Sequence, residues 1–251
     1  MRITGDRYFD NDSRFRACLQ RYEEAVQAGS MPFLDVDDVV DLADYYHITG
    51  EFDKAEAIAD WGVATYPGEA LPLVFKARRA LQRGDIPAAT VYAEQIADKH
   101  DVDYHFIHAE LILADGDVLK ADMYLRDIYD QIPEDMHSDF ALDSASLFSD
   151  YEQADPAWSW LMLVDPNTDE LVYHEIRGRL LLYQGRTVEA KQQFQQLVDA
   201  YPMSENYWVL LACAQDMLGL TDEAVTSAQY ALAINPSNEA VKEFLKEQEQ
   251  L

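Results

Sequence analysis

Apolar side chains recur along this chain with the period of a helix. One stretch spaces its apolar residues by three, one and three positions: Val39, Leu42, Ala43 and Tyr46. A second kind of stretch spaces them by four and three: Ala190, Phe194 and Leu197. Each pattern forms a single stripe on a helix with 3.6 residues per turn. The sequence therefore predicts amphipathic helices that bury their stripes against neighbouring helices.

Turn residues divide the chain at nearly constant intervals. They are Gly50, Gly84, Gly116, Ser149, Gly185 and Gly219, and the steps between them are 34, 32, 33, 36 and 34 residues. Five positions after each turn residue stands an alanine: Ala55, Ala89, Ala121, Ala154, Ala190 and Ala224. Seventeen positions after it, five of the six copies carry a proline: Pro67, Pro133, Pro166, Pro202 and Pro236. Small residues let two helices approach closely and proline ends a helix, so each interval predicts a helix-turn-helix unit.

With these residues the sequence resembles the tetratricopeptide repeat family, as an array of bacterial type, from about Val36 to Pro236. The last full copy carries the family's signature residue types: Trp208, Leu211, Ala212, Gly219, Ala224, Ala228, Ala231 and Pro236. The resemblance implies an all-α fold, a right-handed α-α superhelical solenoid of about six repeats. We expect a single domain over 1–251, with a half repeat at 12–30, repeats at 36–69, 70–101, 102–134, 135–170, 171–204 and 205–238, and a capping helix at 239–251.

Single helices are predicted to cover both ends of the array. Asp12 or Ser13 can cap the first helix, which ends at Gly29, and Asn238 can cap the last. The last helix carries three apolar residues on one side: Val241, Phe244 and Leu245. This helix suits a C-terminal cap. It equally suits the opening helix of a seventh repeat, in which case the chain is the N-terminal repeat region of a longer protein.

The fourth repeat departs from the pattern. Ser138 and Ala145 stand where large aromatic residues are usual, and Pro156 falls inside the expected second helix. Because proline is tolerated in the first turn of a helix, we expect this helix to start late, with Asp155 as its cap, and to be short. The two tryptophans that follow are interpreted as compensating core and not as a ligand platform: Trp158 and Trp160.

The charge balance narrows the class of partner. The chain has 47 acidic and 19 basic residues and a formal net charge of −28, so its field repels nucleic acid and anionic lipid headgroups and attracts basic proteins. The first residues lack the apolar core of a signal peptide, and no stretch has the ~20 apolar residues that span a bilayer. We therefore expect a cytoplasmic protein without membrane insertion. The two cysteines, Cys18 and Cys213, form neither a disulfide framework nor a metal motif.

The strongest functional signal comes from the resemblance, because first helices of the family line a concave groove with repeat positions two, five, six and nine. The residues that we predict to bind a protein or peptide there are Asp41, Asp44, Phe75, Arg78, Phe106, Glu110, Asp139, Phe140, Asp143, Glu175, Arg179 and Tyr183. The four aromatic residues of this set would form a stripe flanked by carboxylates, suited to a basic or amphipathic segment. The alternative is that several of them pack against the neighbouring repeat. Arg78 and Arg179 are expected to pair with neighbouring carboxylates.

No motif in the sequence indicates catalysis or cofactor binding. His105 and His108 lie three positions apart and are the one candidate pair for a metal-dependent site. Both fall on packing positions, and His174 occupies the equivalent of His105 in the fifth repeat, which favours packing. The sequence therefore predicts a non-enzymatic scaffold or adaptor without cofactor or metal. A self-associating assembly protein, a homo-oligomer, is the alternative.

Overall fold

The fold is built from α-helices and one short 3-10 helix, with no strand among the described residues. The computed structural model describes residues 13–165, 167, 168 and 170–248. Contacts divide the chain into two compact units, Met1–Gln131 (unit 1) and Ile132–Leu251 (unit 2). No described helix is both long and apolar enough to cross a membrane.

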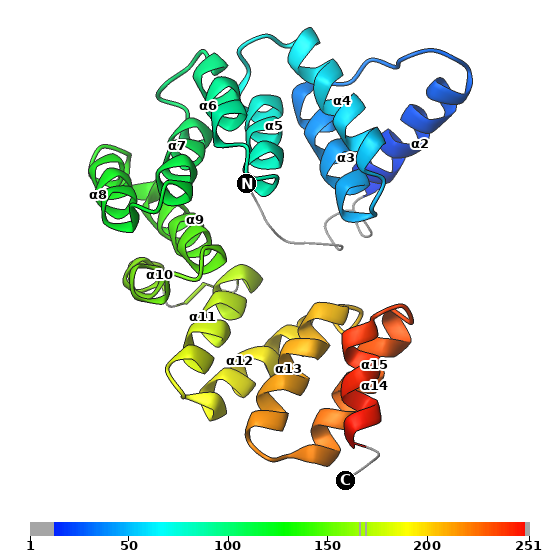
Figure 1. Ribbon diagram of the computed structural model, residues 1–251, viewed down its shortest axis with the longest axis vertical. Coiled ribbons are helices and arrows are strands. Elements are labelled where there is room, and N and C mark those ends of the chain that lie inside the picture. Colours follow the sequence, from blue (N-terminus) through cyan, green and yellow to red (C-terminus); the bar gives the residue numbers. More distant parts are fainter. Residues whose placement is uncertain (1–12, 166, 169, 249–251) are drawn as a thin grey trace. The chain divides into compact units, whose positions relative to one another are not determined.

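Unit 1 consists of helices that pack in consecutive pairs (Figure 1). In chain order they are α2 (Ser13–Gln27), α3 (Val36–Ile48), α4 (Phe52–Thr65), α5 (Ala70–Gln82), α6 (Ile86–Gln95), α7 (Val102–Ala114) and α8 (Val118–Tyr129). Helices α3 and α4, α5 and α6, and α7 and α8 form the pairs, and α2 packs on α3. First helices also contact one another, α3 with α5 and α5 with α7. Successive repeats of unit 1 therefore stack on one another, as predicted.

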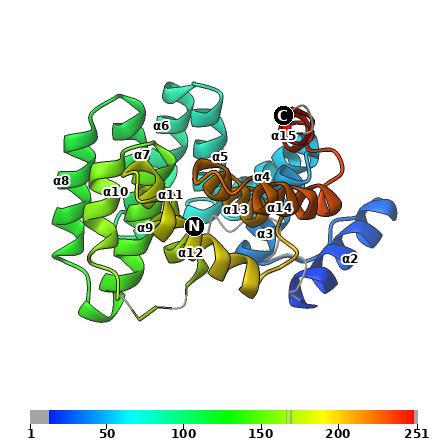
Figure 2. The same ribbon diagram turned by 90° about the horizontal axis from the view of Figure 1, so that it is seen from below.

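Unit 2, taken by itself, also consists of helices that pack in consecutive pairs (Figure 2). Its elements are the 3-10 helix η1 (Glu134–Met136), α9 (His137–Asp150), α10 (Ala154–Leu161), α11 (Leu171–Tyr183), α12 (Thr187–Ala200), α13 (Glu205–Met217), α14 (Thr221–Ile234) and α15 (Glu239–Gln248). The pairs are α9 with α10, α11 with α12 and α13 with α14, and α15 packs on α14. The expected helical solenoid of repeats is thus confirmed within each unit.

Glycine provides the turn in five of the six helix pairs. Gly50, Gly84, Gly116, Gly185 and Gly219 have φ values of 82, 75, 89, 74 and 72°. This left-handed region is open to glycine without the steric cost that a Cβ brings, so glycine at this place ends the first helix. In each of these pairs the second helix begins two residues after the glycine.

The fourth pair makes the same turn with a glutamate, which corrects the predicted alignment. Ser149 is a buried residue of α9, and the left-handed residue is Glu152, with φ 57°. The packing alanine five positions later is Ala157, which is fully buried, and not the partly exposed Ala154. Measured from Glu152, Ala145 stands at the position of the small residues Ala43 and Ala109. Its small size is therefore regular and not a departure from the pattern.

Helix α10 is short, as expected, with eight residues where α12 and α14 have 14. Its start was predicted wrongly: the helix begins at Ala154 after Gln153, and not after Asp155. Pro156 is tolerated because it lies in the first turn, where backbone N–H groups have no partner within the helix. Trp160 is fully buried and Trp158 is partly buried against the core of the following pair, which confirms their role as core.

The buried core depends on small residues where helices cross. An added Cβ on Gly178 of α11 would overlap with the Phe194 ring of α12, so the fully buried phenylalanine fits because the glycine has no side chain. The alanines of the second helices, Ala55, Ala89, Ala121, Ala190 and Ala224, are likewise fully buried. Close approach at these points holds each pair together.

The end of the first helix and the start of the last helix are as the sequence predicts. Gly29, with φ 73°, follows the end of α2, and Asn238 Oδ1 accepts a hydrogen bond from the Val241 backbone N–H at the start of α15, over 3.0 Å. Val241 is buried, and Phe244 and Leu245 pack beside it. Of the two predicted caps of the first helix, Ser13 is the first residue of α2, and Asp12 lies outside the described residues, as does Pro166.

Candidate functional site

The predicted groove residues lie on the first helices of both units, and each unit is described by itself. Repeat positions are counted from the first residue of α3, α5, α7, α11 and α13. Positions two, five, six and nine of these helices are called the first-helix face. In unit 1 this face includes six predicted site residues: Asp41, Asp44, Phe75, Arg78, Phe106 and Glu110. Since α5 contacts both α3 and α7, these residues lie on adjacent helices.

The expected aromatic stripe is not exposed at three of its four residues. Phe75 is 6% exposed and belongs to the core cluster of the first helix pair, with its ring edge-on to His47 at 6.4 Å. Phe106 and Phe140 are each 3% exposed, and Phe140 packs against Trp160 with ring centroids 6.1 Å apart. These phenylalanines therefore stabilise the fold and offer no accessible surface. Tyr183 is the exception, at 75% exposed.

A nearly buried ion pair occupies position nine of unit 1. The Arg78 Nε donates a hydrogen bond to Glu110 Oε1 over 2.6 Å, and the two side chains are 14% and 8% exposed. Burial lowers the pKa of Arg78, but the carboxylates of Glu110, Asp103 and Asp44 outweigh it, so that the net pKa is raised. Arg78 thus pairs with a neighbouring carboxylate, as predicted, and the pair joins the second repeat to the third.

Asp44 is a carboxylate of unit 1 whose pKa is well above its ordinary value. Burial raises its pKa to about 6, and the Asp41 charge adds to the rise, while Arg78 opposes it. Desolvation disfavours the ionised form more than Arg78 favours it. Near neutral pH this part of the first-helix face therefore carries a carboxylate that is close to its titration point.

In unit 2 the predicted charged residues form a looser arrangement. Arg179 Nη1 lies 3.7 Å from Asp150 and 4.0 Å from Glu175, and its side chain is 39% exposed. Burial raises the pKa of Glu175, and the Arg179 charge opposes the rise. The expected pairing of Arg179 is confirmed. Asp139 lies exposed and Asp143 half-buried on α9.

The corrected turn also changes which residues of α9 lie on the first-helix face. Counted from Glu152, positions two, five, six and nine are Asp139, Leu142, Asp143 and Ser146. Phe140 therefore leaves the set, which agrees with its contact with Trp160. Asp139 and Asp143 remain in it.

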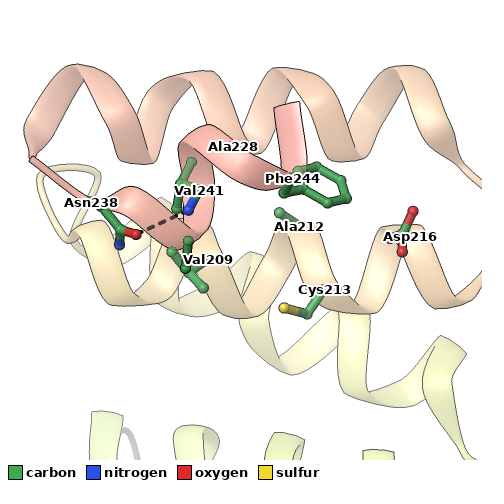
Figure 3. Close-up of a pocket in the computed structure, with 9 residues that line it drawn as sticks. Val209, Ala212, Cys213, Asp216, Ala228, Asn238, Val241 and Phe244 are labelled. Carbon is green, nitrogen blue, oxygen red and sulfur yellow. Dashed lines mark hydrogen bonds between the residues drawn. The ribbon is translucent and has the colours of Figure 1, made fainter. Parts of the chain in front are cut away.

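An open apolar pocket lies at the C-terminal end of unit 2, and the sequence prediction did not include it (Figure 3). Its volume is about 200 Å³. It is lined by Val209, Ala212, Cys213 and Asp216 of α13, Ala228 of α14, Asn238 before α15, and Ala240, Val241 and Phe244 of α15. Val209 and Cys213 occupy positions five and nine, and Ala240 and Phe244 occupy positions two and six if α15 is counted as a further first helix. The pocket therefore opens on the first-helix face.

The chemistry of this pocket is apolar with one acidic residue. Asp216 lies one turn beyond Cys213 on α13, on the far side of the pocket from Asn238 in Figure 3. Cys213 is exposed, while Cys18 is buried. Burial and the Asp216 charge raise the pKa of the Cys213 thiol. The sequence signal for the pocket was two small residues that face each other on neighbouring helices: Cys213 at position nine and Ala240 at position two, where every other repeat has a larger side chain.

The histidines form hydrogen bonds and ring contacts inside the repeats. His105 Nδ1 lies 2.6 Å from the Tyr124 hydroxyl, and His174 Nδ1 lies 2.9 Å from Gln193 Oε1. Equivalent residues thus make equivalent contacts with the second helix of their pair, as expected for packing. The His108 ring stacks on Tyr104 at 5.9 Å. Within the described residues, no group of three or more His, Cys, Asp or Glu side chains is arranged to hold a metal ion.

Comparison with known proteins points to one repeat family. The profile described as tetratricopeptide repeat matches residues 177–239. No curated protein matches the sequence. Among solved structures, the Cut9 and Hcn1 hetero-tetramer of the APC/C is similar with a TM-score of 0.59 and 12% identity, over 93% of this chain and 46% of that one. MamA from residue 41 to its end, from Desulfovibrio magneticus RS-1, is similar with a TM-score of 0.50 and 16% identity, over 68% of this chain and 97% of that one.

Proposed function

The chain is a tetratricopeptide repeat protein, and from this premise we propose that it is a non-catalytic scaffold that binds a basic or amphipathic segment of a protein partner on its first-helix face. Helical repeats bury their stripes between neighbours and leave one face of each first helix for other contacts. In this chain the residues of that face differ in charge and size from one repeat to the next. The alanines and glycines where two helices of a pair cross stay small in every repeat.

One observation carries the proposal: the charge of the first-helix face is acidic in both units. In unit 1 the predicted site holds Asp41, Asp44 and Glu110 against Arg78, and the arginine already pairs with Glu110. In unit 2 it holds Asp139, Asp143 and Glu175 against Arg179, which lies beside Glu175 and Asp150. Each arginine is engaged within the chain, so the remaining field favours a cationic partner.

The similar structures support a protein as the partner. The structure with Cut9 is that of a hetero-tetramer with Hcn1, an assembly of more than one kind of polypeptide. Here the same architecture is combined with a net charge of −28, so we expect the partner segment to carry lysine or arginine.

Fluorescence anisotropy with two short peptides tests this function. One fluorescein-labelled peptide carries lysines around a central phenylalanine, and its matched control carries glutamates in place of the lysines. We expect the lysine peptide to bind, with an affinity that falls as salt is added, because surface charges are screened within about 10 Å at 0.1 M salt. Equal affinity for the two peptides, or no binding of either, would contradict the proposal.

Self-association is the second candidate, and one surface favours it. Leu119 and Met123 lie one turn apart on α8 and are 69% and 59% exposed. A second copy could cover such an apolar pair, although the net charge of −28 opposes association of like chains. Sedimentation velocity over a range of protein concentrations distinguishes the two candidates: a scaffold that acts as a monomer keeps one sedimentation coefficient, and an assembly protein does not.

A further inference from the structure

The pocket between α13, α14 and α15 is separate from the residues that the sequence predicts as the binding site. None of its lining residues belongs to that set, and it needs no residue of unit 1. Val209, Val241 and Phe244 form apolar walls of the pocket (Figure 3). Two small residues of its lining, Cys213 and Ala240, are exposed. A groove position that is lined by apolar atoms and reaches solvent favours an apolar ligand group.

The size of the pocket limits what can occupy it. A protein cavity of about 150 Å³ lined by apolar side chains is large enough for benzene, and this pocket measures about 200 Å³. It therefore has room for one large side chain, such as leucine or phenylalanine, and not for a cofactor or a helix. A single buried anchor residue is also the usual way in which a short segment gains affinity and register.

The charges around the pocket indicate which residues should stand next to the anchor residue in the bound segment. Asp216 is the one charged residue among the lining residues. On α15, Glu243 and Glu247 are exposed at positions five and nine, the positions of the first-helix face. The lysine nearest in sequence, Lys242, is engaged with Glu239, with Nζ 2.7 Å from Oε1. Lys246 of α15 is also exposed, but the three carboxylates Asp216, Glu243 and Glu247 outnumber it. The surroundings are therefore net acidic, and they favour lysine or arginine next to the anchor.

We infer that this pocket is an anchor site that takes one leucine or phenylalanine side chain from a basic segment of another protein. The inference rests on the proposed scaffold function. It adds where on the first-helix face the segment is anchored and which type of side chain the pocket selects. The anchor fills the space between Val209 and Phe244, and a neighbouring basic residue of the segment meets Asp216.

Three peptides and two variants test the anchor site. The peptides are the lysine peptide with phenylalanine, the same peptide with alanine in place of phenylalanine, and the glutamate peptide with phenylalanine. Because burial removes the apolar surface of the phenylalanine from water, the phenylalanine peptide should bind the wild type at least about tenfold more tightly than the alanine peptide. Ala240→Leu fills the pocket and should remove that ratio. Ala233→Leu, on an exposed position of α14 that does not line the pocket, should preserve it.

The outcomes separate the anchor site from the scaffold function. If both lysine peptides bind equally well, or if Ala240→Leu leaves the phenylalanine preference intact, the anchor site is wrong while the acidic scaffold stands. If the lysine peptides bind no better than the glutamate peptide, the scaffold function fails, and the anchor site fails with it. If Ala240→Leu instead converts a dimer into a monomer in sedimentation, the occupant is a second copy of this chain, and the inference is overturned.

Reaction of Cys213 with N-ethylmaleimide fills the pocket without a substitution and should remove the preference for phenylalanine in the same way as Ala240→Leu.

Discussion

Position nine of the first helices differs between the second and third repeats of unit 1 and the C-terminal end of unit 2, and the first-helix face is closed in one place and open in the other. In unit 1 this position holds Arg78 and Glu110, whose long side chains meet and are nearly buried. At the end of unit 2 it holds Cys213 on α13 and Glu247 on α15, and the short cysteine leaves an apolar pocket. The same backbone arrangement thus gives a closed face where two long side chains meet, and an accessible one where short side chains of neighbouring helices leave a pocket. A repeat fold can therefore place a binding site without any change in its helices.

Glu110→Ala tests the closed face and has the largest expected effect. The substitution leaves the buried Arg78 without its main partner, and breaking a buried pair in this way costs about 3 kcal/mol of the free energy of unfolding. The matched control is Glu175→Ala in unit 2, where Arg179 is 39% exposed and the loss should stay below about 1 kcal/mol. Urea unfolding followed by circular dichroism measures both. Equal losses would show that the two faces do not differ as described.

Asp44→Asn tests the charge balance of the closed face. Because the folded-state pKa of about 6 lies above the ordinary value of 3.8, the folded chain binds this proton more readily than the unfolded chain does. The ionised carboxylate therefore destabilises the fold above about pH 6, and the group's contribution improves as the pH falls toward 4. The variant should be more stable than the wild type by about 2 kcal/mol near pH 7.5, with no difference below pH ~4.

The control for this titration is Asp53→Asn, at an exposed position in the first turn of α4. Chemical unfolding at a series of pH values gives the free energy of unfolding of each variant. A stability difference for Asp44→Asn that does not change with pH would contradict the raised pKa.

Cys213→Arg converts the open face into the closed one. The new arginine stands at the position of Arg78, and Glu247 already stands at the position of Glu110. We expect the arginine to cover the pocket and to reduce binding of the phenylalanine peptide to that of the alanine peptide, a loss of about tenfold. Cys213→Ser keeps the small size and should preserve the preference. If the arginine variant still binds the phenylalanine peptide more tightly than the alanine peptide, side-chain length at this position does not decide whether the pocket is open.

The two cysteines provide the smallest and most local test. Cys18 of unit 1 is buried and has its pKa raised to about 11, mainly by burial, so it should react with N-ethylmaleimide only after unfolding. Cys213 should react in the folded state. Asp216→Asn removes a charge that raises the thiol pKa, so it should speed the reaction of Cys213 by a few-fold near pH 8, a rough expectation from the loss of one nearby charge. Asp222→Asn, at an exposed position on α14, is the control, and an unchanged rate in both variants would contradict the placement of Asp216.

The repeat fold could be predicted from the sequence because glycine is the usual residue at the left-handed turn position. Gly50, Gly84, Gly116, Gly185 and Gly219 therefore gave the period directly. The fourth repeat was misaligned because Glu152 adopts the same backbone conformation without being glycine, and because two alanines, Ala154 and Ala157, both lie near the expected place. Backbone conformation at such a residue is set by the packing of the whole pair, which one sequence does not display.

The site was predicted less completely than the fold. Repeat positions indicate which face of a helix a residue occupies, so the pairing of Arg78 and Arg179 could be foreseen. They do not indicate how much of that face a neighbouring helix covers, and Phe75, Phe106 and Phe140 proved to be buried. The pocket was missed for a related reason: an empty volume results from short side chains on three helices at once, and no groove residue was predicted on α15 although its sequence also suits an opening helix of a further repeat.

Protection of Cys213 from alkylation tests the account most directly, because it locates the bound segment with a residue that the chain already has. Folded protein is treated with N-ethylmaleimide in the presence of saturating lysine peptide with phenylalanine, and modification of each cysteine is followed by mass spectrometry. The account predicts that Cys213 is modified at least several-fold more slowly with this peptide than with the alanine peptide, by a rough estimate from the difference in occupancy. Modification of Cys213 at the same rate with bound peptide as without it would show that the segment does not enter the pocket.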